Sequence, residues 1–235
     1  MADGRGFTLV ELIIVIAIIA VLATIAIPGL IRGRLASNET VAIAGLRTIT
    51  TAQAQFKNAK AVDLDSDGSG EHGFIQELSG IGPCRSDGGV AGPALSPSAL
   101  ASAFGTSALA SGGIVERTGY LYLMYLPGAV AAIAEAVPLP DGDVAFADTQ
   151  EMRWTCYAWP TDYGQSGNRC FVVNQVGSLH AASNDGPLYT GLGSPPPAEA
   201  AYDTTGPNPA NLDSIIMSDP SGISGDGQLW FPVGG

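Results

Sequence analysis

Apolar residues dominate the start of the chain. Residues 7–31 hold a single ionisable side chain, Glu11, in 25 positions. As a helix rising about 1.5 Å per residue, this segment is long enough to cross a hydrocarbon core of about 30 Å. No polar stripe runs along it, which argues against the core helix of a soluble domain. We therefore predict a membrane-spanning or otherwise fully apolar helix over residues 7–31.

The pattern changes after residue 31. From Leu35 to Phe56, apolar side chains recur every three, four or seven positions, and polar side chains such as Gln53 lie between them. This spacing is typical of an amphipathic helix. The two segments together predict one helix over residues 7–61, about 80 Å long, whose second half, residues 32–61, packs on a globular head.

Pro28 interrupts this helical pattern. Proline removes one intrahelical hydrogen bond and clashes with the carbonyl group four residues earlier. Gly29 follows directly. We therefore expect a kink or a locally melted turn between Thr24 and Gly29, with the helix continuing beyond it.

Residues 62–235 are numerous enough for a domain with its own core. Aromatic and β-branched runs bounded by turn residues predict a three- or four-stranded antiparallel sheet. The expected strands cover residues 119–126, 152–159, 170–175 and 178–180. A short helix is predicted within residues 95–109, and a surface loop over residues 186–209. The fold class is thus α+β, with a long N-terminal helix against a β-rich head.

Charge and composition argue against some classes of function. The formal net charge is −12, so a phosphate backbone would be repelled and nucleic acid is not an expected partner. Only 14% of residues are charged, and 31 glycines and 16 prolines indicate a turn-rich head. His72 and His180 are far apart in sequence, and no nucleophile motif or nucleotide-binding loop accompanies them. We predict no enzymatic activity and expect both histidines at the surface.

Glu11 is unusual because an acid inside an apolar helix is unfavourable in a bilayer. One interpretation is an acid near the helix start that reaches the membrane interface and interacts with the helix dipole. The other needs a cation. Cleavage between Gly6 and Phe7 would create an α-amino group four residues before Glu11, and in an assembly the amine of one subunit could pair with the Glu11 of its neighbour.

The run Gly6-Phe7-Thr8-Leu9-Val10-Glu11, followed by the aliphatic segment with Pro28, resembles the N-terminus of type IV pilins and type II secretion pseudopilins. The resemblance covers about the first 35 residues. It implies that residues 1–6 are a leader removed by a prepilin peptidase, and that Phe7 is then N-methylated. It also implies storage in the inner membrane with the head outside the cytoplasm, followed by assembly into an extracellular or periplasmic filament.

By the same resemblance, the expected partners are other copies of the chain, membrane lipid, the prepilin peptidase, and an inner-membrane assembly platform with its ATPase. Pilus and secretion pseudopilus both remain open. A different hypothesis is a membrane-anchored calcium-binding or adhesive module that never polymerises. An anchored hydrolase is a third class, for which the sequence offers no site.

An acidic loop follows the predicted helix. Its carboxylates alternate along the chain at Asp63, Asp65, Asp67 and Glu71, and Gly68 lies at the sixth position, as in loops that wrap around calcium. The twelfth position is Phe74, where such loops need a bidentate glutamate, so Glu77 or a distant acid would have to complete the site. The alternative is an acidic turn that ends the helix.

The three cysteines permit three pairings. Cys156 and Cys170 bracket a Pro/Gly-rich connection between two predicted strands. A disulfide between them would close a 15-residue loop and contribute about 3 kcal/mol in an oxidising compartment. We predict this pairing, with Cys84 free or intermolecular. The alternative is three reduced, buried cysteines.

Overall fold

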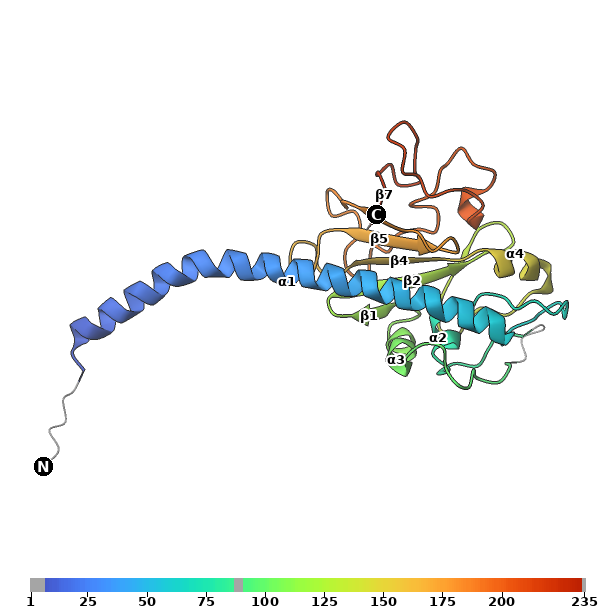
Figure 1. Cartoon of the computed structure of the whole chain (residues 1–235), viewed down its shortest axis with the longest axis horizontal. Helices are drawn as coiled ribbons and strands as arrows, with labels where there is room; N and C mark the ends of the chain where they lie inside the picture. Colours follow the sequence, from blue (N-terminus) through green and yellow to red (C-terminus); the bar gives the residue numbers. More distant parts are fainter. Residues whose placement is uncertain (1–6, 87–90, 234–235) are drawn as a thin grey trace, which may run out of the picture.

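The structure is a computed structural model that describes residues 7–86 and 91–233. A long helix extends from a β-rich head, and the N-terminal half of this helix projects away from the rest of the molecule (Figure 1). The predicted α+β class is confirmed. The predicted leader, residues 1–6, lies outside the described residues.

Helix α1 (Leu9–Ala59) contains 51 residues. Thr8 caps its N-terminus, and Lys60, with a φ of 50°, ends it in the left-handed conformation. The helix is continuous through Pro28, so the melted turn predicted between Thr24 and Gly29 is absent. Instead, α1 bends gently along its projecting half (Figure 1).

Seven antiparallel strands form one sheet, more than the three or four predicted. The order is β1-β2-β4-β5-β6-β7, and β3 pairs with β2 beside this path. The strands are β1 (Val115–Arg117), β2 (Tyr120–Leu126), β3 (Ile133–Ala134), β4 (Thr155–Pro160), β5 (Cys170–Asn174), β6 (Leu179–Ala182) and β7 (Phe231–Pro232). The predicted strands at residues 119–126, 152–159, 170–175 and 178–180 correspond to β2, β4, β5 and β6, whereas β1, β3 and β7 are too short for a periodic signal.

One face of the sheet packs against the second half of α1. The buried helix residues Leu46, Ile49 and Phe56 belong to the same core as Tyr122 and Phe171 of the sheet. Close packing needs a small residue here: a Cβ atom on Gly45 would lie 2.8 Å from the Tyr122 hydroxyl oxygen. The amphipathic pattern therefore buries its apolar stripe within the same chain.

The other face of the sheet is covered by the long C-terminal loops. Tyr157 and Trp159 of β4 share a second core with Tyr202 and Trp230, which come from these loops. The loops lie on the side of the sheet away from α1 (Figure 1). Because both faces are covered, every residue of β2, β4, β5 and β6 is buried.

Short helices complete the head around the end of α1. They are α2 (Ile75–Leu78), α3 (Ser102–Ala110), α4 (Ala147–Met152) and the 3₁₀ turns Val144–Phe146 and Pro209–Asn211. The helix predicted within residues 95–109 corresponds to α3, which begins later than expected. The acidic residues after α1 and those of α4 therefore lie at the end of the head remote from the N-terminal segment (Figure 1).

Candidate functional site

The projecting half of α1 carries an extended apolar surface. Its large apolar side chains are exposed, from 45% at Val15 to 75% at Ile25. α1 is long and apolar enough to cross a membrane. A surface of this size, without partners in its own chain, needs lipid or other protein to cover it. The helix predicted over residues 7–31 is present, and its first turn begins at Leu9.

Glu11 lies in the first turn of α1 and takes part in a capping box with Thr8. The Glu11 carboxylate accepts hydrogen bonds from the Thr8 backbone N–H at 2.9 Å and from the Thr8 hydroxyl at 2.7 Å, and the Thr8 hydroxyl accepts one from the Glu11 N–H at 3.2 Å. The Thr-x-x-Glu spacing is the sequence signal for this motif, which our sequence reasoning missed. Within one chain, the local donors stabilise a carboxylate that would otherwise be unsatisfied in an apolar setting. Phe7 is exposed beside it, whereas Gly6 lies outside the described residues.

A polar contact marks the point where α1 enters the head. The Glu39 carboxylate accepts hydrogen bonds from the backbone N–H groups of Asn168 and Arg169, and it forms an ion pair with the Arg169 guanidinium at 2.8 Å. Next to it, the Asn38 amide donates to the Ser166 carbonyl at 2.8 Å. We call these residues the neck latch. Sequence reasoning did not identify it, because its partners are far apart along the chain.

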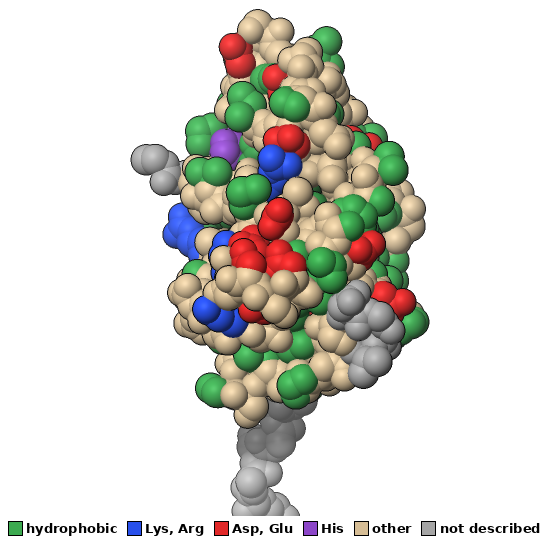
Figure 2. Space-filling view, turned by 90° about the vertical axis from the view of Figure 1, so that its right-hand side faces the viewer, with side chains coloured by type: hydrophobic (Ala, Val, Ile, Leu, Met, Phe, Trp, Pro, Cys, Tyr) green, Lys and Arg blue, Asp and Glu red, His purple; other side chains and the backbone are tan. Residues whose placement is uncertain are grey.

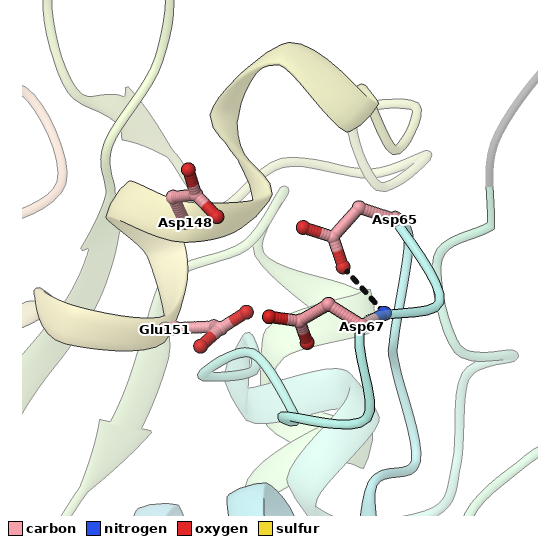
Figure 3. Close-up of side chains that lie close together, drawn as sticks. All are labelled: Asp65, Asp67, Asp148 and Glu151. Atoms are coloured by element: carbon pink, nitrogen blue, oxygen red, sulfur yellow. Dashed lines mark hydrogen bonds between the residues drawn. The ribbon is translucent and has the colours of Figure 1, made fainter.

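The acidic loop does not gather its carboxylates as predicted. Asp65 and Asp67 lie together with Asp148 and Glu151 of α4, and ligand atoms of these four residues all lie within 4.8 Å of one another (Figure 3). We call this group the acidic tip. Oxygen-only ligand sets of this kind suit calcium. The prediction that a distant acid would be needed fits this arrangement, although Glu77 is not that acid.

Two of the four predicted calcium ligands, Glu71 and Asp63, lie outside the acidic tip, so the structure does not bring the predicted set together. Glu71 is fully buried, and its Oε1 atom accepts a hydrogen bond from the Leu64 N–H at 2.7 Å. Its burial raises the pKa of the carboxyl group. Asp63 is not part of the acidic tip either, and its Oδ1 atom is buried without a hydrogen-bond partner among the described residues.

A buried ion pair organises the interior next to this loop. The Arg85 guanidinium contacts the Glu77 carboxylate at 3.0 Å, and it also donates to the Gln150 side chain and to the His72 carbonyl. This network connects α2 and α4, and Glu77 is the partner of Arg85 in it and not a member of the acidic tip. Removing one partner from such a pair is strongly unfavourable, because it leaves a buried charge uncompensated.

The prediction that the two histidines lie at the surface is wrong, because both are buried. His72 packs against Trp154 with ring centroids 6.0 Å apart. Burial, together with the positive charges of Lys57 and Arg85, lowers the pKa of His72 to about 4. His72 is therefore a neutral core residue at physiological pH.

The predicted disulfide is also contradicted. All three cysteines are free and buried. In the sheet, Cys156 of β4 lies opposite Val173 of β5 and not opposite Cys170. Since alternate residues of a strand point to opposite faces, Cys156 points into the α1-side core and Cys170 into the core under the C-terminal loops. The alternative of three reduced, buried cysteines agrees with the structure.

Comparison with known proteins concerns the N-terminal part of the chain. Residues 1–27 match the prokaryotic N-terminal methylation motif. The chain is similar to the "Type IV major pilin protein PilA" of Myxococcus xanthus (strain DK1622), with 47% identity over 74 residues. This match covers 32% of the present chain and 33% of the relative.

A second relative is the "Type IV wide pilus major component PilA4" of Thermus thermophilus, with 46% identity over 57 residues. The match covers 24% of the present chain and 44% of that protein. The chain thus spans less than half the length of either relative. No solved structure matches significantly.

Proposed function

We propose that this chain, whose N-terminal segment is similar to that of type IV pilins, is a structural subunit of a type IV pilus-like or pseudopilus filament, without catalytic activity. The observation that carries this proposal is the projecting half of α1, whose apolar side chains are exposed in the single chain. In storage, lipid covers this surface. In the filament, the same helices of other copies cover it.

Maturation would proceed by removal of residues 1–6 in the inner membrane and N-methylation of Phe7. The head would then lie outside the cytoplasm, and an assembly platform with its ATPase would extract the subunit. The family resemblance of residues 1–27 supports this sequence of events. Peptide mass spectrometry of the native chain tests it: a methylated Phe7 terminus is expected, and a chain that retains Met1 or Ala2 would contradict it.

Glu11 would act at the assembly step. The capping box with Thr8 keeps the carboxylate satisfied within one chain, and the Phe7 amine of a neighbour would replace or supplement these donors in the filament. A Glu11→Ala substitution should leave membrane insertion intact and reduce the yield of sheared filaments, as counted by electron microscopy. Glu116→Ala, at an exposed glutamate of the head, is the matched control and should assemble like the wild type. Wild-type filament levels from Glu11→Ala would refute the role.

Calcium binding by the head stays a prediction, now with Asp65, Asp67, Asp148 and Glu151 as the residues that would hold the ion. Calorimetric titration of the full chain in detergent, after treatment with a chelator, tests it. Binding that is lost in the D65N/D67N variant is the expected result, and no heat change at millimolar calcium would end the hypothesis. Neither result bears on filament assembly through α1.

A further inference from the structure

Two arginines lie on α1 between its apolar half and the head. Arg32 and Arg34 are exposed, and they precede the neck latch at Glu39 by only a few residues. Among the described residues, ion pairs are formed by Arg85, Arg153 and Arg169, and none involves this arginine pair. Since the two positions point to different sides of the helix, they present positive charge around the neck. The pair is directly continuous with the apolar surface that would mediate assembly.

The acidic tip presents the opposite charge at the far end of the head. Its four carboxylates lie within 4.8 Å of one another, and acidic side chains gather on the end of the head that Figure 2 views. Lys57 lies beside the group, but it donates a hydrogen bond to the Glu151 main-chain carbonyl. The Glu151 Oε1 atom is buried and has no hydrogen-bond partner within the described part of the chain.

The four carboxylates of the acidic tip lie close together in the isolated chain. Like charges this close repel one another. A cation from outside the chain would relieve the repulsion, and the planar guanidinium group suits carboxylate oxygens because it offers several fixed donors.

The two charged regions cannot meet within one chain, because α1 holds them apart. Lys57 contacts Glu151 and so marks the level of the acidic tip along the helix. Arg34 lies 23 residues before Lys57, which corresponds to about 35 Å along a helix. Consider two copies whose α1 helices lie side by side and parallel, with one copy shifted by about 35 Å along the helix direction. This shift would bring the arginines of one copy to the level of the acidic tip of the other.

We propose that Arg32 and Arg34 of one copy form ion pairs with the acidic tip of a second copy, displaced along the filament axis. This interface rests on the proposed filament function. Burial of apolar side chains is not directional, whereas the charged contact helps to fix the axial displacement between copies. The acidic tip is thus an interaction surface whose partner is this same chain.

Charge reversal tests the interface. The R32E/R34E variant and the D148K/E151K variant are each expected to lower the yield of sheared filaments by about tenfold or more, because like charges meet in the first and the tip loses its net negative charge in the second. The combination of all four substitutions should restore filaments. R47E is the matched control, since Arg47 is also exposed on α1 and lies inside the head region; its combination with D148K/E151K should not restore them. Membrane-fraction levels and thermal unfolding of each variant show whether it inserts and folds.

Cross-linking gives a second readout that does not depend on yield. In filaments of the R34C/D148C variant, a short bismaleimide should produce a ladder of covalent oligomers in a chelator-containing buffer, because each copy contributes one site of each kind. The native cysteines are buried and should not react. The R47C/D148C variant is the control and should give no ladder.

Several outcomes would overturn the interface. Wild-type filaments from R32E/R34E, or the absence of a ladder, contradict it and leave the filament function intact. Filaments that need calcium, together with failure of the four-substitution rescue, would identify the acidic tip as a calcium site instead. A loss of R32E/R34E from the membrane fraction would assign the arginines to lipid phosphates. If the wild-type chain itself forms no filaments, both the interface and the proposed function are wrong.

Discussion

The two halves of α1 form one continuous helix but have different surroundings. The first half, up to Ile31, is apolar on all sides, and its isoleucines are about half exposed or more. The second half carries a single apolar stripe, and Leu46, Ile49 and Phe56 along it are fully buried. The comparison shows where each half finds its partners. A stripe can be covered by one sheet, whereas a helix that is apolar all round needs surroundings on every side.

The same difference explains where ionisable groups are tolerated. The second half of α1 and the surrounding head bury several charges with specific partners, such as Arg85 for Glu77 and Arg169 for Glu39. The apolar segment of the first half contains only Glu11, whose partner is the adjacent Thr8. The head thus depends on tertiary pairs, and the projecting half depends on local ones. The following experiments test that division.

Matched isoleucine substitutions should give the largest contrast. Ile49→Ala removes a fully buried side chain from the α1-side core and should lower the free energy of unfolding by about 4 kcal/mol. Ile16→Ala, at a side chain that is 56% exposed, should change it by less than about 0.5 kcal/mol. Denaturant unfolding of the full chain in detergent, followed by tryptophan fluorescence, measures both. Equal effects would mean that the two halves share one core.

Acid should destabilise the head through His72. Its pKa is lowered to about 4 in the folded chain, whereas the unfolded chain has the ordinary value of about 6.5. The stabilising contribution is therefore complete above about pH 6.5 and is lost as the pH falls toward 4, with a total of about 3 kcal/mol. Unfolding curves at pH 7 and pH 4 should differ less for His72→Gln than for the wild type. An unchanged difference would show that another group is responsible.

The neck latch should contribute less. Glu39→Gln keeps the shape of the side chain but removes the charge that pairs with Arg169, and we expect a loss of about 1 kcal/mol, because Arg169 is partly exposed to solvent. Hydrogen exchange should also become faster in the turn of α1 around Asn38. Glu116→Gln is the control at an exposed glutamate. Faster exchange in this control as well would argue against a specific latch.

The smallest effect concerns the cysteines. Because all three are free and buried, a reductant should shift the midpoint of thermal unfolding by less than about 1 °C, whereas loss of a disulfide would cost about 2 to 5 kcal/mol. Non-reducing mass spectrometry of the chain provides the direct measurement. A Cys156–Cys170 peptide would contradict the strand register of β4 and β5.

Local patterns made much of the fold predictable. The apolar run and the spacing from Leu35 to Phe56 were sufficient for α1, and aromatic or β-branched runs located β2, β4 and β5. Such signals are strong because each depends on neighbours a few positions apart. Edge strands β1, β3 and β7 comprise only two or three residues each, and their existence is decided by pairing with distant partners.

The sites depended more on tertiary placement. Asp65 and Asp67 were found from their spacing, but Asp148 and Glu151 join them only because α4 folds back beside the end of α1. The disulfide prediction failed because loop length says nothing about which face of a strand each sulfur occupies. Buried His72 carried no recognisable pattern of its own. In contrast, the segment from Gly6 to Glu11 is a local motif, and the sequence was sufficient to recognise it.

The neck latch also has a mechanical consequence. If filaments form through α1, a pulling force travels along the bundle of helices and reaches each head at Asn38 and Glu39. There it loads several hydrogen bonds and the Arg169 ion pair together, so that they share the strain before the sheet itself is disturbed. A fibre of such subunits would bear tension along its helices while its outer domains keep their shape.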